Sequence, residues 1–436
     1  MRTPTGRESA LTVHLRHPLS LAAIAVAIRA LYLFVAPQAD PQDTPDYDEI
    51  ALNLLAGKGF VSTSNWFGFE IRSWRPPGYP VFLSAVYAVF GYHHVAVQLI
   101  QALLGGALVL VVHFLARQVE PGLAVATAIV VVVYPPLVHI SSEIMSESLL
   151  TLLLTTAMAA GLRAAIADRP SWSLAVGVLV GAASLTRPVA LLVWPALLLG
   201  TAVTHHRAHG QITSSWSRGA GWFSGALLLT LLPWTLRNYA VHDAWVPIST
   251  HGGFILARSN GPDPGWRKAD GWGIERKALE GTPSEVERDH QWRRQALDHV
   301  RADPARWLRL CGERFLRFWY PFRPDYNIGF VLILPLAAAG FARFGLRSNF
   351  LPLSALCALS VVVFSCALYG STRFRLPLEP IFLLYACAFG LDWWRRKRSR
   401  MLPLAYWWVA VNALIWWQQE AVRGAVVKIL QTGGLK

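Results

Sequence analysis

The chain has 436 residues, of which 54% are hydrophobic and only 15% are charged. Soluble domains carry about 25% charged residues, so this composition excludes an ordinary soluble protein. The formal net charge is +14, but the basic residues fall mainly in short loops between apolar runs, where they orient membrane helices. This placement argues against nucleic acid as a partner. Apolar runs of about 20 residues recur along almost the whole chain and predict an all-α protein that crosses the membrane many times.

The chain begins with basic residues followed by an apolar run, as a signal peptide does. Arg29 lies inside this run and no small-residue cleavage site follows it, which favours a retained first span at about residues 19–36. Because a charge in the apolar layer is costly unless it is paired, we expect Arg29 to face the interior of the bundle. The segment after this span is then external.

Residues 37–92 are predicted to form an external loop that contains most of the acidic residues near the membrane. Residues 47–55 have helical apolar spacing and predict a short amphipathic helix on the membrane surface. After the rigid turn Arg75–Pro80, residues 81–90 are too few to span and predict a second interfacial helix. Five acidic residues of the loop lie together within residues 38–60: Asp40, Asp43, Asp46, Asp48 and Glu49.

The remaining apolar runs complete a predicted bundle of about 11 transmembrane helices. One span follows Glu147 and runs toward Arg163. The others are predicted at residues 95–116, 122–140, 172–186, 188–204, 219–234, 327–342, 350–368, 376–391 and 402–417. The short basic loops between them all fall on one side and every acidic candidate on the other.

A long polar region at 237–325 is predicted to be a second external loop with an amphipathic helix at about 306–319. The chain has four cysteines. They show no metal-binding spacing and lie mostly in apolar runs, so we expect neither a disulfide framework nor a zinc site. The sequence predicts five parts. They are the N-terminus with the first span (1–36), the first external loop (37–92), a first membrane part (93–236), the long external loop (237–325) and the last membrane part (326–436).

Four separate segments place acidic and guanidinium groups on the external side. Arginines can hold phosphate oxygens bidentately and stabilise a departing phosphate. A carboxylate can take a proton from an attacking hydroxyl. No nucleotide-binding loop motif is present. The pattern therefore indicates chemistry on a lipid phosphate, with candidates in 43–49, at Arg72 and Arg75, at Glu143 and Glu147, and at Arg373 and Arg375.

These segments resemble the C-type membrane glycosyltransferases, in the bacterial group related to protein O-mannosyltransferases and the lipid A aminoarabinose transferase. Enzymes of that class move a sugar from a polyprenyl-phosphate carrier to an acceptor on the outer side of the membrane. The chain is shorter than the protein and lipid A enzymes, so neither acceptor carries over. The matching segments are Asp43–Ala51 (DTPDYDEIA), Arg75–Pro80 (RPPGYP), Ser146–Leu150 (SESLL) and Arg373–Pro380 (RFRLPLEP).

The resemblance implies an enzyme of the bacterial inner membrane whose active site faces the periplasm and whose donor is a polyprenyl-phosphate sugar. The catalytic candidates are Asp43, as general base, and Glu147, which would orient the acceptor or the sugar. Arg75, Arg373 and Arg375 are the candidates for the donor phosphate. Further candidates for substrate contacts are Asp46, Tyr47, Asp48, Tyr79, Glu143, Arg187, His251 and Asn260.

Simpler structural roles remain open for several of these residues. Asp43 stands where a helix N-cap would, and Glu147 suits a helix N-terminus by charge alone. Asp46 and Asp48 fit the wet side of the surface helix, although with Asp43 they would also allow a divalent cation. Arg75 fits a snorkelling interfacial anchor. The remaining candidates in the long loop, His251 and Asn260, fit a turn.

Two other functions also remain open for the whole chain. A transporter or flippase of lipid-linked sugars would need phosphate-binding arginines too, but it is expected to show inverted repeats, and we find none. A non-catalytic subunit of an envelope glycan synthase would keep the fold and lose the activity.

Overall fold

The computed structural model describes residues 17–35, 44–63, 70–167, 170–262, 284–320 and 329–397, together with Trp407 and Ala410. These residues are helical apart from short connections and one isolated bridge between Ser62 and Ile71. The predicted all-α class is therefore confirmed. The upright helices of the bundle are α2 (Pro18–Tyr32), α5 (His94–Val119), α6 (Ala124–Val133), α8 (Glu147–Ala167), α9 (Pro170–Thr186), α10 (Val193–His209), α11 (Ser214–His242), α16 (Phe330–Phe344), α17 (Leu351–Cys366) and α18 (Glu379–Lys397).

The described helices make a polytopic membrane protein. By length and composition, 6 of them could cross a membrane, or up to 7 if one bent pair is counted as a single span. Shorter apolar helices, among them α2, α9 and α16, occupy three more of the predicted spans. The predicted span at 402–417 lies outside the described residues, so the count of about 11 stays a prediction.

The predicted span at 122–140 is interrupted by a bend. Helix α6 ends at Val133, α7 (Pro135–His139) follows, and the two parts are bent by 58°. The physical reason is visible in the sequence, because Pro135 and Pro136 have no N–H to donate. The carbonyl groups of Val131 and Val132, which would accept those bonds in a continuous helix, therefore need other donors.

Arg29 supplies these donors. Its Nη2 lies 3.4 Å from the Val131 oxygen, and its Nη1 lies 3.4 Å from the Val132 oxygen. The side chain is fully buried, as predicted, and it crosses α5 at Gly105, where a Cβ would overlap the guanidinium. A cation at the C-terminal end of a helix also opposes the negative end of the helix dipole. Arg29 is thus paired with backbone carbonyls of the broken helix.

Contacts between the loops define two ends of the bundle. At one end Arg395 lies 3.4 Å from Glu120, and Arg207 donates to the Leu346 carbonyl at 2.7 Å. At the opposite end lie α3 (Thr44–Leu55), α4 (Gly78–Phe90), α12 (Gly252–Asn260), α13 (Glu285–Ala302) and α14 (Pro304–Trp319). We call this opposite end the outer end. The acidic candidates were expected at the outer end. The short basic loops gather at the end where Arg395 contacts Glu120.

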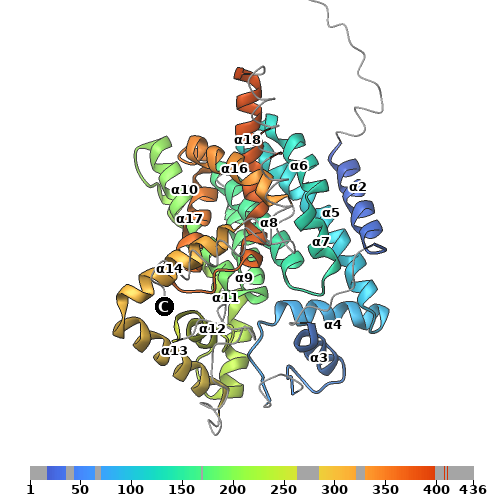
Figure 1. Ribbon diagram of the computed structural model, residues 1–436, viewed down its shortest axis with the longest axis vertical. Coiled ribbons are helices and arrows are strands. Elements are labelled where there is room, and N and C mark those ends of the chain that lie inside the picture. The colour runs from blue at the N-terminus through green and yellow to red at the C-terminus, as the bar shows by residue number, and fades with distance from the viewer. Residues whose placement is uncertain are drawn as a thin grey trace, which may run out of the picture.

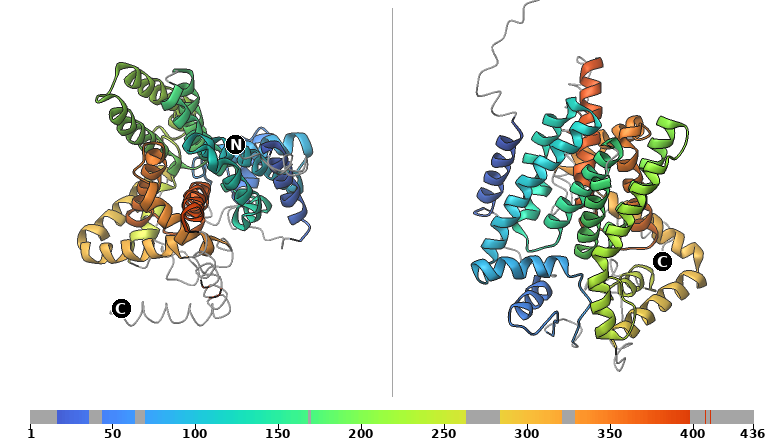
Figure 2. Two further views of the ribbon diagram at one scale, coloured as in Figure 1. Left: turned by 90° about the horizontal axis from the view of Figure 1, so that it is seen from above. Right: turned by 180° about the vertical axis from the view of Figure 1, so that it is seen from behind.

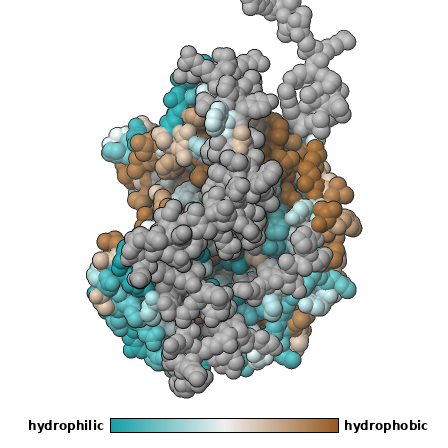
Figure 3. Space-filling view, in the orientation of Figure 1, coloured by the Kyte–Doolittle hydropathy of each residue, from teal (hydrophilic) through white to brown (hydrophobic). Residues whose placement is uncertain are grey.

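The outer end has the two predicted interfacial helices. Helix α4 lies across the lower ends of the upright helices in both side views, with α3 beneath it (Figures 1 and 2). The surface changes along the same direction, from hydrophobic over α2 to hydrophilic over α13 (Figure 3). The predicted amphipathic helix at 306–319 is present as α14.

Candidate functional site

Glu147 is the centre of the candidate site. It is the first residue of α8, and its side chain is fully buried. Its carboxylate lies 2.9 Å from Arg187 Nη1 and also accepts a hydrogen bond from Arg373 Nε. Arg187 follows the end of α9, and Arg373 belongs to η6 (Thr372–Leu378). Three segments that are distant in sequence therefore meet at one carboxylate.

The described part of this cluster contains two guanidinium groups that contact one carboxylate. The Arg187 and Arg373 side chains keep 15% and 22% of their surface exposed, whereas Glu147 keeps none. Arg187 also lies over the Phe374 ring, with 5.6 Å from Cζ to the ring centroid. Guanidinium groups held in this way can bind phosphate oxygens in a fixed geometry. The site is therefore suited to an anionic ligand.

The start of α3 lies beside this cluster. The Thr44 hydroxyl donates to the Ile144 carbonyl at 3.2 Å, and Thr44 is buried. Asp43, the predicted general base, immediately precedes Thr44 but lies outside the described residues. In the same region His139 Nε2 lies 3.3 Å from the Glu143 carboxylate.

Two glutamines of α5 hold the segment that precedes Glu147. Gln101 Nε2 donates to the carbonyls of Ser141 and Glu143 at 3.1 and 2.7 Å. Gln98 Nε2 donates to the Ser142 carbonyl at 2.7 Å. Neither glutamine was predicted as part of the site, although two amides one turn apart in an apolar run are a visible signal in the sequence. They satisfy backbone groups that the broken helix leaves without partners.

Tyr79, a candidate substrate contact, belongs to the same support. Its hydroxyl donates to Gln101 Oε1 at 3.1 Å, and its side chain is fully buried. Its helix begins at Gly78, where a Cβ would lie 2.9 Å from the Thr186 backbone nitrogen. This close approach places the Arg75–Gly78 turn against the residue that precedes Arg187.

Asp46 and Arg75 form a buried ion pair. Arg75 Nη2 lies 2.8 Å from Asp46 Oδ2, and the two residues are 8% and 5% exposed. The guanidinium also lies over the Tyr47 ring, at 5.1 Å. Two expectations are corrected here, because Asp46 is not on a wet helix face and Arg75 is not a snorkelling anchor. Helix α3 packs against α4 instead of lying alone on the surface, and this covers both residues.

Asp48 was also expected to be solvated, and this too is wrong. It is 6% exposed and accepts hydrogen bonds from Tyr87 at 2.6 Å and Tyr92 at 3.1 Å. His94 Nε2 lies 2.7 Å from the same carboxylate. Asp46 and Asp48 thus have different partners. Among the described residues, no group of three or more histidine, cysteine or acidic side chains could hold a metal ion.

Arg375 lies deeper than its predicted contact with the donor phosphate requires. It is fully buried, lies 3.0 Å from Glu379 and donates to the Phe318 carbonyl at 2.7 Å. Its Cζ lies 3.4 Å from the centroid of the Phe330 ring. In this structure the buried Arg375 therefore holds η6 in place through Phe318 and Glu379. Arg373, and not Arg375, contacts Glu147 at the candidate site.

The two long loops at the outer end are joined at Glu285, in a contact that we call the Glu285 clasp. Its carboxylate accepts hydrogen bonds from the backbone N–H groups of Arg72 and Ser73, at 2.8 and 3.1 Å, and from the Thr250 hydroxyl. Trp74 follows directly and packs in the same cluster as Phe254 and Trp292. The long loop thus holds the backbone that leads to Arg75.

The predicted turn at His251 and Asn260 is also wrong, because these residues are the N-cap and the last residue of α12. The His251 ring stands 4.4 Å from the Trp74 ring between centroids. Asn260 Oδ1 accepts a hydrogen bond from Arg314 at 2.8 Å. The segment is helical because Phe254 and its neighbours pack against α13. Both residues therefore have packing partners in the long loop.

Removing the Glu285 carboxylate tests the clasp. In Glu285→Ala, the backbone N–H groups of Arg72 and Ser73 lose their acceptor, so we expect destabilisation of about 1–3 kcal/mol. Hydrogen exchange should accelerate in residues 70–75 and stay unchanged in α5. Glu287→Ala is the matched control on the same helix, since the Glu287 side chain is 42% exposed. Equal exchange in the two variants would contradict the assigned role.

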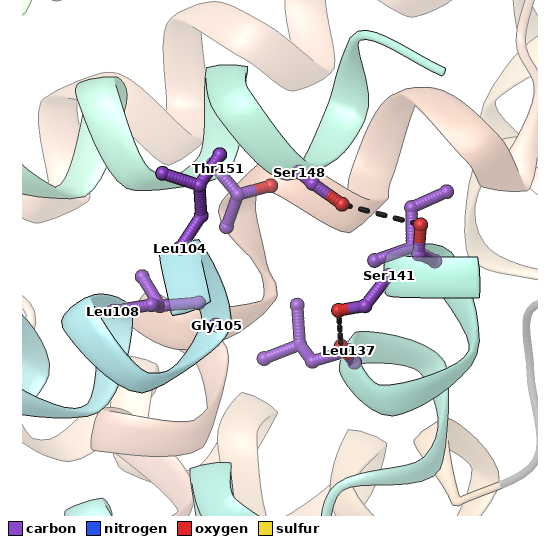
Figure 4. A pocket seen from close by; sticks show the side chains of 8 residues that line it. Leu104, Gly105, Leu108, Leu137, Ser141, Ser148 and Thr151 are labelled. Atoms are coloured by element: carbon purple, nitrogen blue, oxygen red, sulfur yellow. Dashed lines mark hydrogen bonds between the residues drawn. The ribbon is translucent and has the colours of Figure 1, made fainter. Parts of the chain in front are cut away.

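A small pocket lies between α5, α7, η2 (Ile140–Ser142) and α8 (Figure 4). Its polar side chains turn toward the backbone. Ser148 donates to the Ile140 carbonyl at 3.2 Å, and Ser141 donates to the Leu137 carbonyl at 3.3 Å. None of the charged candidate residues lines this pocket.

The arrangement of the described helices is that of the C-type glycosyltransferase fold. The chain superimposes on the apo oligosaccharyltransferase of Archaeoglobus fulgidus with a TM-score of 0.59 and 15% identity, over 94% of this chain and 55% of that one. The AglB structure from the same organism, in complex with an inhibitory peptide and a dolichol-phosphate, gives 0.60 and 15%, over 93% and 54%. ArnT from Cupriavidus metallidurans, bound to undecaprenyl phosphate, gives 0.58 and 17%, over 94% and 64%.

Residues 74–234 match the family model described as dolichyl-phosphate-mannose-protein mannosyltransferase. This match includes Arg75, Glu147 and Arg187. No curated protein matches the chain. The chain spans 55% of the length of the archaeal enzyme. The resemblance to the C-type glycosyltransferases that was inferred from the sequence is thus confirmed. The shared fold supports it over the largest part of the chain.

Proposed function

We propose that the chain is a membrane glycosyltransferase that moves a sugar from a polyprenyl-phosphate donor to an acceptor at the outer end. We place it in the bacterial inner membrane with this end toward the periplasm, because the short basic loops gather at the opposite end. The observation that carries the proposal is the pair of partly exposed guanidinium groups, Arg187 and Arg373, that meet at the buried Glu147 carboxylate. A lipid-borne phosphate that arrives at the membrane surface would meet these two guanidinium groups.

The chemistry follows from the charges. Arg187 and Arg373 bind the phosphate oxygens and stabilise the negative charge that grows as the bond from the sugar to the phosphate breaks. Asp43 takes the proton of the acceptor hydroxyl, whose oxygen attacks the anomeric carbon from the opposite side and inverts it. Glu147 holds the two arginines in place. Arg75, paired with Asp46, sits in the neighbouring turn as a further phosphate contact.

Two structural neighbours support this donor class. AglB was solved with a dolichol-phosphate and ArnT with undecaprenyl phosphate, and both ligands are polyprenyl-type phosphates. These two ligands were observed bound to AglB and to ArnT. For this chain the donor class rests on the same fold together with the guanidinium groups at its outer end.

Donor binding by Arg187 and Arg373 is directly testable. Each alanine variant should weaken the binding of undecaprenyl phosphate to the purified protein by about 10–100-fold, because a charge-assisted hydrogen bond contributes about 1.5–3 kcal/mol. Arg218→Ala, an exposed arginine at the opposite end, is the control and should bind as the wild type does. If both site variants kept wild-type affinity, the phosphate assignment would be lost.

The other two functions predict a different outcome in one assay. In vesicles that contain the donor, a transferase changes the labelled sugar from a carrier-linked to an acceptor-linked form. A flippase moves the labelled carrier across the bilayer and leaves the sugar attached, and a non-catalytic subunit does neither. A comparison of envelope glycolipids and glycoproteins with and without the protein identifies the acceptor to use.

A further inference from the structure

Cys311 and Cys366 meet at the outer end, where α14 packs against the C-terminal end of α17. Besides burial, the nearby Cys366 thiol is one of the groups that raise the pKa of the Cys311 thiol. Both residues also contact one nitrogen atom, because Arg314 Nη2 lies 3.4 Å from Cys311 Sγ and 3.1 Å from the Cys366 carbonyl oxygen. Both cysteines are partly exposed free thiols in this structure.

Arg314 keeps the two cysteines together. It is fully buried, and its Nε donates to the Ser365 carbonyl at 2.6 Å. Its Nη1 donates to the Ser259 carbonyl at 2.9 Å. These carbonyls belong to the last turns of α17 and α12, where a cation is favourable. Helix α14 cannot move away from α17 without breaking these hydrogen bonds, so Cys311 and Cys366 stay near each other in the folded chain.

The cysteine pair also adjoins the segment that leads to the candidate site. After Cys366 the chain passes Gly370, where a Cβ would overlap the backbone carbonyl oxygen of Arg314. It then reaches Arg373, which binds Glu147. A covalent link at Cys366 would thus fix one end of the segment that carries this arginine.

We propose that Cys311 and Cys366 form a disulfide bond that joins α14 to the end of α17. The two thiols lose two protons and two electrons to a disulfide oxidant by thiol–disulfide exchange, and the oxidant leaves as two thiols. The proposal rests on the orientation given under the proposed function, since disulfides persist on the oxidising side of the membrane. Burial raises the pKa of the Cys311 thiol, and the Arg314 guanidinium opposes this shift.

Thiol labelling tests the bond without any turnover. Membranes are quenched in acid, and the denatured protein is treated with a maleimide carrying a polyethylene glycol chain, with and without prior reduction. We expect two protected thiols before reduction and a Cys311–Cys366 linked peptide by mass spectrometry. Cys311→Ala should expose the Cys366 thiol. The matched control, Cys357→Ala with Cys387→Ala in the spans, should keep the linked peptide.

The proposal is overturned if Cys311 and Cys366 are both alkylated without reduction in most wild-type chains. A second measurement is the melting temperature in detergent. Reductant should lower it by about 5 °C in the wild type and leave the Cys311→Ala/Cys366→Ala double variant unchanged. An equal effect on both proteins would count against the bond. An active transferase without the linked peptide would refute this inference alone, and a linked peptide in a protein without transfer would refute only the proposed function.

Discussion

Replacing Glu147 with alanine is expected to destabilise the protein by about 3–5 kcal/mol, because it leaves two guanidinium groups facing each other in a mostly buried position. Arg187 and Arg373 would lose the carboxylate that now lies between them. They should separate, so donor binding should fall as well. The free energy of unfolding in mixed detergent micelles measures the first effect.

A double-mutant cycle separates pairing from simple loss of packing. If Glu147 and Arg373 act as a pair, the effects of Glu147→Ala and Arg373→Ala should differ from additivity by about 0.5–3 kcal/mol. Glu120→Ala is the control at the opposite end, since its contact with Arg395 is largely exposed. It should change stability by less than about 1 kcal/mol. Additive effects of the first two variants would show that the pair is not coupled.

The variant Asp43→Asn should lower sugar transfer by about 100–10,000-fold, the range that a general base contributes. Asparagine keeps the size of the side chain but cannot take the acceptor proton. The affinity for undecaprenyl phosphate should stay within about twofold of the wild type, because the guanidinium groups are unchanged. Transfer of a radiolabelled sugar from the carrier to the acceptor is the measurement.

Helix capping is the rival role for Asp43, and asparagine is nearly as good an N-cap as aspartate. A purely capping Asp43 would therefore leave both stability and transfer unchanged in Asp43→Asn. Asp43→Ala adds a second readout, because it removes both roles. If Asp43→Asn kept full transfer while Asp43→Ala lost stability, Asp43 would be a cap and the base would have to be sought elsewhere.

The helical class and the gathering of the short basic loops at one end could be predicted because they depend on local composition. An apolar run must become a helix in lipid, where each backbone polar group needs a partner within its own segment. The arrangement of short basic loops then fixes which ends lie together. Even the break at Pro135 and Pro136 was visible in the sequence, since two successive residues without an N–H cannot continue a helix.

The partners of the candidate residues could not be predicted in the same way. Glu147 and Arg373 are 226 residues apart, and no local pattern links them. Asp46 and Asp48 have the spacing of a wet helix face, and their burial depends on α4 packing over α3. The partners of Arg375 could not be predicted for the same reason. Arg373 and Arg375 carry the same charge in one short segment, but they differ in burial. Burial of a polar residue is a property of the assembled bundle.

The pairing of Arg29 with the broken helix also bears on how the chain is assembled. The guanidinium lies 103 residues ahead of the Val132 carbonyl in the chain, so it is synthesised and inserted first. When α6 enters the membrane, the donor for its Val131 and Val132 carbonyls is already there. The first helix thereby serves as an internal template for the bend, and the bend can form without exposing unpaired carbonyls to lipid.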